Sequence, residues 1–245
     1  MYSRPDNLPE VLQALDQKKW RILSGGTDFY PSFVGQPVEC NIMDVSSVRG
    51  LKQIKEEEDG TICIGALVTW NDLMNFELPS SFDGIKLAAK EVGSIQIQNR
   101  ATIVGNICNA SPAADGIPPL LTLNAKLRLE SVRGLRELKL SEFVLGNRRT
   151  AIGKNELVTH IIIPGHSNLG KSHFIKLGSR KYLVISISMV SARIYKGDQG
   201  NILDAAISVG SCSIVAKRLF ELEKTLIGVE LSEDIVDLIE DKHLN

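Results

Sequence analysis

Cysteine and histidine are scarce in this chain, and neither residue type clusters. The 245 residues include four cysteines and four histidines, and no two cysteines form a C-x-x-C pair. Zinc and iron–sulfur sites need several such ligands at short, regular spacing, so we expect no metal site held by this chain alone. Scattered cysteines with mostly apolar neighbours are typical of reduced core residues. The residues that this interpretation places in the core are Cys40, Cys63, Cys108 and Cys212.

Long hydrophobic runs and an excess of charge of one sign are also absent from the sequence. No run approaches the roughly 18 apolar residues that a membrane-spanning helix needs, and no apolar signal core follows residues 1–6. The 28 basic and 29 acidic residues give a net charge of −1, without the basic excess of a nucleic-acid-binding protein. Hydrophobic residues (43%) and charged residues (23%) have ordinary frequencies for a globular protein. We therefore expect a cytoplasmic protein with no membrane span and no nucleic-acid partner.

Helical and strand patterns are mixed along the chain, without a regular alternation of strand and helix. Apolar spacing predicts helices over residues 8–18 and 85–92, and Thr69 with Asp72 predicts a capped helix that ends near Phe76. Two further helical patterns lie between residues 213 and 239. Strands are expected at residues 20–23, 41–45, 51–55, 61–64, 126–131, 158–163, 174–177, 184–194 and 202–209. The predicted fold class is α+β, with a domain boundary near residues 164–172.

That boundary contains a literal match to the P-loop pattern. Residues 165–172 read Gly-His-Ser-Asn-Leu-Gly-Lys-Ser and follow a predicted strand. A nucleotide triphosphatase needs a helix directly after this loop, because the N-terminus of that helix helps to hold the phosphates. Residues 173–178 instead alternate as a strand does and are soon broken by glycine. We expect a polar loop here, with a nucleotide triphosphatase as the alternative.

The segment of residues 98–115 is long, rich in small and turn-forming residues, and nearly free of net charge. Such a segment inside a compact domain is usually functional or disordered, and the apolar runs on both sides argue against disorder. We therefore expect an ordered loop that wraps a ligand. The shorter segment Ser24–Asp28 has the same small-residue chemistry and follows a predicted strand. Two such loops indicate one ligand with a polyanionic centre, such as the pyrophosphate of a dinucleotide, held by backbone N–H groups.

The glycine pair Gly25-Gly26 is weak evidence when taken alone. A strand-to-turn connection that binds nothing would use the same residues. The pattern G-x-G-x-x-G is absent, and no clear amphipathic helix follows Gly26, so the sequence argues against a Rossmann site. A dinucleotide site in this chain requires another fold.

The chain resembles the FAD-binding medium subunit of molybdenum hydroxylases, a family that includes bacterial xanthine dehydrogenases and carbon monoxide dehydrogenases. The resemblance extends over most of the chain, and its motifs occur in the family's order. They are Tyr2–Pro5, Leu23–Asp28, Ile64–Ala66, Gln98–Asp115 and Phe174–Leu177. The resemblance implies a vanillyl-alcohol-oxidase-type (PCMH-like) FAD-binding fold of two α+β subdomains and a smaller C-terminal α+β domain. The implied domains are residues 1–165, with subdomains of about 1–55 and 56–165, and a C-terminal domain of residues 170–245 that is expected to be shorter than is usual in the family.

The resemblance also implies a set of cofactor-binding residues. Residues 22–29 would form the first pyrophosphate loop and residues 102–106 the second, with a hydrogen-bonding carboxylate and a lysine near the cofactor. The implied residues are Ile22, Leu23, Ser24, Gly25, Gly26, Thr27, Asp28, Phe29, Ile64, Thr102, Ile103, Val104, Gly105, Asn106, Asp115, Val158 and Lys176. Simpler alternatives remain open: Asp115 could cap a short helix, Lys176 could be a solvated lysine, and Ile64 and Val158 could be ordinary core residues.

The chain departs from the family in the second loop, where Val104 stands in place of the first of two glycines. If that position required a positive φ or a close approach to phosphate, valine would be strained or would widen the loop.

The resemblance implies a function in electron transfer. A molybdopterin large subunit would oxidise the substrate, and a small subunit would carry [2Fe–2S] clusters. FAD on this chain would pass the electrons to NAD or another acceptor, so no catalytic acid–base pair is expected here. The implied assembly is a heterotrimer or a dimer of heterotrimers. The alternatives are a stand-alone flavin oxidase and an assembly subunit without FAD.

Overall fold

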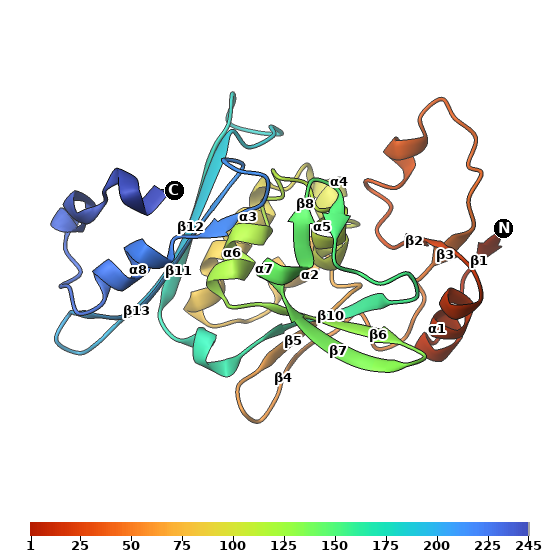
Figure 1. Cartoon of the computed structure of the whole chain (residues 1–245), viewed down its shortest axis with the longest axis horizontal. Coiled ribbons are helices and arrows are strands. Elements are labelled where there is room, and N and C mark those ends of the chain that lie inside the picture. The colour runs from red at the N-terminus through yellow and green to blue at the C-terminus, as the bar shows by residue number, and fades with distance from the viewer. Residues whose placement is uncertain (245) are drawn as a thin grey trace.

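The computed structural model describes residues 1–244, which form an elongated molecule with the N-terminal strands at one end and the C-terminal sheet at the other (Figure 1). The first part is a small sheet with the strand order β1-β3-β2, in which β3 pairs with both neighbours in parallel. Its strands are β1 (Tyr2–Ser3), β2 (Arg21–Leu23) and β3 (Ile42–Asp44). Helix α1 (Leu8–Gln17) connects β1 to β2 and buries Val11 and Leu15, as its apolar spacing predicts.

The central part is an antiparallel sheet with the strand order β4-β5-β10-β6-β7. Its strands are β4 (Ile54–Glu56), β5 (Ile62–Gly65), β6 (Lys126–Ser131), β7 (Gly134–Lys139) and β10 (Leu157–Ile163). The strands expected at residues 51–55 and 61–64 form a hairpin around Asp59-Gly60, in which β4 pairs with β5 and Gly60 adopts φ +77°. Strand β10 lies in the middle of the sheet, which explains its nearly continuous apolar run.

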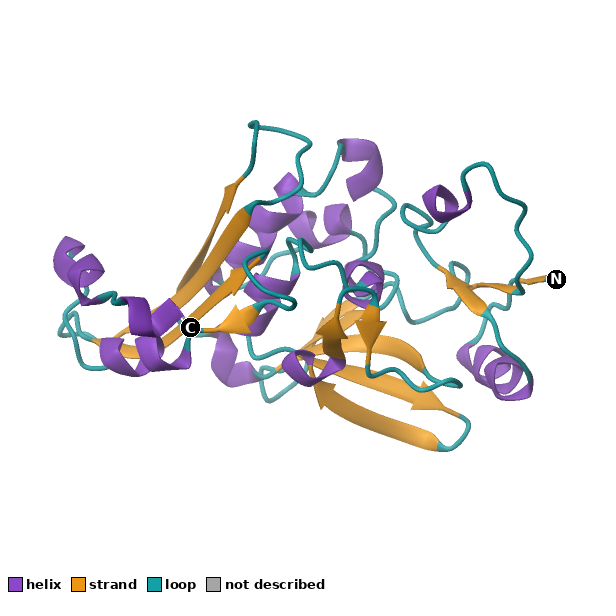
Figure 2. Cartoon of the chain, turned by 45° about the horizontal axis from the view of Figure 1, so that its top comes forward, coloured by secondary structure: helices purple, strands orange, loops and turns teal. Residues whose placement is uncertain are grey.

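Short helices connect and cover the sheets (Figure 2). The predicted capping box is confirmed, because Thr69 and Asp72 exchange side-chain and backbone hydrogen bonds at the start of α2 (Trp70–Asn75). The other helices of this region are α3 (Asp83–Glu91), α4 (Ile95–Gln98), α5 (Ile103–Asn109), α6 (Ile117–Thr122) and α7 (Leu140–Phe143). Strands β8 (Val144–Gly146) and β9 (Arg149–Thr150) form a separate two-stranded ladder.

The C-terminal part is an antiparallel sheet with the strand order β11-β12-β13-β14. Its strands are β11 (Lys171–Leu177), β12 (Ser188–Lys196), β13 (Ile202–Gly210) and β14 (Lys217–Arg218). Helices α3 and α6 pack against this sheet, and so does α8 (Phe220–Leu226), whose Leu222 and Leu226 join a small core with Ile202 and Ile207 of β13. The change from the central sheet to this one falls at residues 164–170.

Two arginines of the C-terminal sheet, one buried (Arg193) and one partly buried (Arg218), reach the end of α6. Arg193 donates from Nε to the carbonyl oxygen of Thr122 at 2.9 Å, and Arg218 donates from Nη1 to that of Leu121 at 3.0 Å. Glu223 accepts two hydrogen bonds from Arg218. The last carbonyl groups of a helix have no partner within the helix. Arg193 supplies a donor to Thr122 from a remote part of the sequence, and Arg218 adds a second donor to Leu121, which also accepts from the N–H of Asn124.

Four predictions about local structure are wrong. Residues 98–115 are not one loop, because α5 occupies their middle and ends where Ala110 adopts the left-handed conformation. The strand expected at residues 184–194 begins at Ser188. The second helical pattern before residue 239 is the 3-10 helix η4 (Glu233–Leu238), since Gly228 adopts φ +83° and ends α8. The cysteines do not lie in the core, because two are partly exposed and two are exposed.

The P-loop alternative is also wrong. Residues 165–168 form the 3-10 helix η3 (Gly165–Asn168), and the chain then enters β11 rather than a helix. A phosphate-binding loop of this class needs the helix that is missing here. No helix within residues 1–244 is both long enough and apolar enough to cross a membrane.

Candidate functional site

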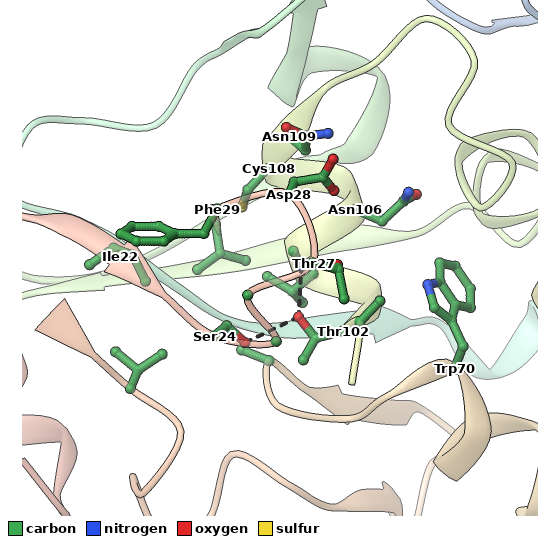
Figure 3. Close-up of a pocket in the computed structure, with 18 of the residues that line it drawn as sticks. Ile22, Ser24, Thr27, Asp28, Phe29, Trp70, Thr102, Asn106, Cys108 and Asn109 are labelled. Atoms are coloured by element: carbon green, nitrogen blue, oxygen red, sulfur yellow. Dashed lines mark hydrogen bonds between the residues drawn. The ribbon is translucent and has the colours of Figure 1, made fainter. Parts of the chain in front are cut away.

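A cavity of about 360 Å³ lies between the turn after β2 and helix α5 (Figure 3). The turn supplies residues 24–29, and α5 supplies residues from its N-cap to its last turn. The floor and walls come from the central sheet and the loops beside it. The two small-residue segments identified in the sequence therefore face one cavity, although 70 to 80 residues separate them in the chain.

Gly25 is required where the two segments touch. A Cβ atom on Gly25 would collide with the carbonyl oxygen of Arg100, and would lie 2.8 Å from the carbonyl carbon of Arg100 and 3.0 Å from Cα of Ala101. Gly26 is required for a different reason, because its φ of +81° is strained for other residues. The glycine pair thus lets one backbone turn sharply and approach the other closely.

Thr102 connects the two segments through its hydroxyl group. As the N-cap of α5, its Oγ1 accepts a hydrogen bond from the N–H of Gly105 at 3.0 Å. The same oxygen lies 3.2 Å from Oγ of Ser24 in the first turn (Figure 3). The expected strain at Val104 is absent, because Val104 lies in the first turn of α5 and is buried with a negative φ.

Arg21 lines the cavity and contacts two aromatic rings of the segment that begins with the first turn. The guanidinium carbon of Arg21 lies 4.4 Å from the ring centroid of Phe33 and 5.1 Å from that of Phe29. Its Nη2 donates to Oγ of Ser32 at 2.7 Å. The buried ring of Phe29 is therefore fixed at the edge of the cavity.

Two buried polar atoms of the cavity wall have no hydrogen-bond partner anywhere in residues 1–244. They are Oδ1 of Asn106 and Nε1 of Trp70. Buried polar groups are normally paired, so both atoms call for a partner that the chain does not supply. Together with the glycine cradle, they make the cavity suitable for a polar ligand of the size of a nucleotide.

Asp115 and Lys176 form a buried ion pair outside the cavity wall. Nζ of Lys176 donates to one carboxylate oxygen of Asp115 at 2.7 Å, and Oγ of Ser186 donates to the other at 2.5 Å. Both side chains are at least nine-tenths buried. The two simpler alternatives are therefore wrong: Asp115 does not cap α6, whose N-cap is Gly116, and Lys176 is not a solvated lysine.

A second cavity of about 220 Å³ lies behind the first turn and has a basic rim. Ser24 and Thr102 line both cavities. The rim carries Arg4, Lys52 and Arg100. Arg4 and Lys52 each lie near a carboxylate, at 3.6 Å from Asp44 and 3.7 Å from Asp72 respectively, so their charge is partly compensated.

The predicted site residues divide into two groups. Those that line the main cavity are Ile22, Ser24, Gly25, Gly26, Thr27, Asp28, Phe29, Thr102, Val104, Gly105, Asn106 and Val158. Those that do not are Leu23, Ile64, Ile103, Asp115 and Lys176. The side chains of Leu23, Ile64 and Ile103 are buried in the core, while Lys176 lines a third cavity beside β11.

Sequence reasoning missed several lining residues. Most come from elements without a small-residue motif, while Ala101, Cys108 and Asn109 lie within residues 98–115 but were not singled out as site residues. The missed residues are Arg21, Val45, Leu51, Ala66, Trp70, Val92, Ile97, Ala101, Cys108, Asn109, Arg148, Ile152 and Leu157. The place of Cys108 in the cavity wall results from the helical conformation of α5, which turns this side chain toward the cavity. Surrounding protein raises the pKa of the Cys108 thiol to about 12, so it is a neutral wall group rather than a nucleophile.

Within the described chain, no three His, Cys, Asp or Glu side chains gather in an arrangement that could hold a metal ion. The titratable side chains lining the cavity are Arg21, Asp28, Cys108 and Arg148. Arg148 donates to the side-chain oxygen of Asn109, and Arg21 is engaged by the aromatic rings. The cavity therefore presents a surface suited to binding and contains no paired acid and base.

Comparisons with known proteins agree with this geometry. Residues 1–166 match the family described as the FAD binding domain in molybdopterin dehydrogenase. The nicotinate dehydrogenase FAD-subunit of Eubacterium barkeri is 33% identical over 248 residues, covering 95% of this chain and 81% of that protein. The glyceraldehyde dehydrogenase medium chain of Sulfolobus acidocaldarius is 31% identical over 247 residues, covering 98% and 85%.

The fold is likewise shared with solved structures. A chain of carbon monoxide dehydrogenase from Hydrogenophaga pseudoflava superimposes with a TM-score of 0.86 at 24% identity, covering 99% of this chain and 88% of that one. A chain of quinoline 2-oxidoreductase from Pseudomonas putida 86 superimposes with a TM-score of 0.84 at 22% identity, covering 97% and 82%. These matches confirm the predicted α+β fold.

Proposed function

Because the chain belongs to the family of FAD-binding domains of molybdopterin dehydrogenases, we propose that it carries electrons within a multi-subunit dehydrogenase. In this proposal, electrons arrive from [2Fe–2S] clusters of a small subunit and leave through FAD to NAD or another acceptor. A large subunit with molybdopterin oxidises the substrate, and the complex is a heterotrimer or a dimer of heterotrimers. Relatives whose names call them medium chains or FAD-subunits support this role.

The observation that carries the proposal is the meeting of two backbone turns at one cavity. Successive N–H groups in tight turns form a concave surface that binds anions, and a dinucleotide carries two linked phosphates. We assign the diphosphate to the amides of residues 24–28 and, within residues 102–106, to those of Thr102 and Val104, because the other three amides of that segment already donate within the chain. The contact between Gly25 and Arg100, together with the Ser24–Thr102 hydroxyl contact, holds these two groups of donors at a fixed separation.

The wall residues fit the remaining parts of such a cofactor. Apolar side chains such as Ile22 and Val158 provide flat contact surface for a ring, while Phe29 closes one edge. When FAD is bound, it supplies the redox chemistry, and the protein contributes position and electrostatics. We keep Asp115 and Lys176 as candidates for contact with the cofactor, with the Asp115–Lys176 ion pair holding both groups in place.

The chemistry of the cavity favours this role over a stand-alone flavin oxidase. An oxidase needs a base placed over the flavin beside a substrate pocket. Among residues 1–244 the cavity wall offers only Asp28 and the neutral Cys108 as proton acceptors, and Asp28 is exposed. The helical position of Val104 also removes the reason for expecting a subunit that has lost FAD.

The test is the flavin content of the purified full-length chain. We expect either visible flavin absorption as isolated or stoichiometric uptake of added FAD, followed by fluorescence. A colourless protein that takes up no FAD contradicts the proposal. Copurification with subunits that contain iron–sulfur clusters and molybdopterin tests the proposed partners separately.

A further inference from the structure

The indole of Trp70 has an unusual environment for a buried tryptophan. Trp70 is the first residue of α2, and its ring is fully buried, yet its Nε1–H finds no acceptor in the described part of the chain. The other tryptophan behaves normally, since Nε1 of Trp20 donates to the carbonyl oxygen of Ala14 at 2.9 Å. A buried donor without an acceptor is costly, so this N–H points to a missing partner.

An unpaired acceptor lies nearby on the same cavity wall. Oδ1 of Asn106 is buried without a donor, and Gly116 packs against both side chains. A Cβ atom on Gly116 would collide with the tip of the Trp70 ring, and would lie 3.1 Å from its Cζ2 and 3.3 Å from Oδ1 of Asn106. Figure 3 shows both side chains on the same side of α5, with the indole nitrogen on the ring edge that faces the helix.

The chemistry of the missing partner follows from this pairing. A phosphate oxygen would satisfy the Trp70 donor but leave the Asn106 acceptor unpaired, and an amino group would do the reverse. A hydroxyl group both donates and accepts, so one hydroxyl can satisfy both atoms. We propose that Trp70 and Asn106 together bind a single sugar-type hydroxyl of the flavin dinucleotide, on either its ribityl chain or its ribose.

This inference rests on the proposed FAD function and assigns Trp70 a binding role at the same site. Trp70 also packs in the main core, so its ring contributes to stability whether or not a ligand is present. The test therefore needs a readout specific to the N–H group. The chain contains only two tryptophans, so its indole N–H signals can be assigned with one substitution.

The first measurement is the ¹⁵N–¹H spectrum of the full-length Trp20→Phe variant, which retains Trp70 as its one indole. Addition of FAD is expected to shift the indole proton downfield and to slow its exchange with water. Riboflavin, which has the ribityl hydroxyls, and ADP, which has the ribose hydroxyls, identify the source. Only the compound that carries the bound hydroxyl should reproduce the shift.

The second measurement compares FAD affinity between two matched variants. Trp70→Phe removes the N–H and keeps an aromatic ring, and we expect it to bind FAD about three- to tenfold more weakly, as for one lost hydrogen bond. Trp20→Phe, whose indole lies outside the cavity, should bind FAD as the unmodified chain does. If FAD binds without moving the Trp70 signal and both variants bind equally, a water molecule satisfies the pair and the inference is wrong, while the proposed function stands. If the unmodified chain binds no FAD, both are wrong.

Discussion

Gly25→Ala is the substitution that tests most directly how the two turns cooperate. The added methyl carbon would lie 2.8 Å from the carbonyl carbon of Arg100 and 3.0 Å from Cα of Ala101. Non-bonded carbon atoms rest at about 3.5–4.0 Å, so the two backbones must separate by roughly 1 Å. Because the neighbours are backbone atoms, no side-chain rotation can relieve the collision.

The expected loss can be estimated from this displacement. A separation of that size carries the Ser24–Thr102 hydroxyl contact, now 3.2 Å, beyond hydrogen-bonding distance. It also misplaces one set of amide donors relative to the other. Loss of a single charge-assisted hydrogen bond costs about 1.5–3 kcal/mol, which corresponds to at least a tenfold loss of FAD affinity. Strain of this kind destabilises a fold by about 1–3 kcal/mol.

The assay is fluorescence titration with FAD, accompanied by urea unfolding. Gly197→Ala is a matched control, because Gly197 has no positive φ and the atoms nearest to its added methyl belong to the side chains of Asn201 and Leu203, remote from the cavity. We expect the control to bind FAD normally. If Gly25→Ala binds FAD within twofold of the unmodified chain, the two turns do not hold one diphosphate together.

Three further predictions concern titratable groups. Lys176→Met should lower the free energy of unfolding by about 3–5 kcal/mol, because it leaves the buried carboxylate of Asp115 without its cation. Adding Asp115→Asn to this variant should restore most of the loss. Equal stability of the single and the double variant would contradict this reasoning. At pH 8, mass spectrometry should find slow alkylation of Cys108 although its side chain is exposed, because a pKa of about 12 keeps the thiol neutral, and rapid labelling would contradict that raised pKa. Burial, reinforced by nearby cations, lowers the pKa of His160 in the folded chain. As the pH drops through about 6.5, the unfolded chain therefore takes up a proton before the folded chain does, and the free energy of unfolding should fall. His160→Gln should reduce this pH dependence in urea titrations at about pH 5.5 and 7.5, and an unchanged pH dependence would assign it to other groups.

The sequence predicted the backbone elements of the site better than its side chains. Glycine pairs and capping residues act locally, so the turn at Gly25-Gly26 and the cap at Thr69 could be recognised from neighbouring residues alone. Val104 was misjudged because the small residues around it indicated a loop. Small residues are also compatible with a short helix once a threonine caps it and tertiary packing supports it.

Contacts between distant segments could not be predicted from local patterns. Asp115 and Lys176 each had a reasonable local interpretation, but a buried ion pair between residues 61 positions apart depends on how the C-terminal sheet packs. Trp70 gave no signal in the sequence, since a tryptophan at the start of a helix usually belongs to the core. Its importance depends on one unpaired atom, which only the three-dimensional packing reveals.

The two arginines that reach the end of α6 bear on where this molecule could be divided. The match to the family's FAD-binding domain ends at residue 166, which makes that point an obvious place to truncate the chain. A truncated fragment would retain α6 but lose Arg193 and Arg218, so the carbonyl group of Thr122 would lose its arginine donor and that of Leu121 would keep only backbone N–H donors. The end of α6, which belongs to the FAD-binding domain, is thus stabilised by side chains of the C-terminal sheet. The two parts of the chain are therefore expected to unfold in a single thermal transition.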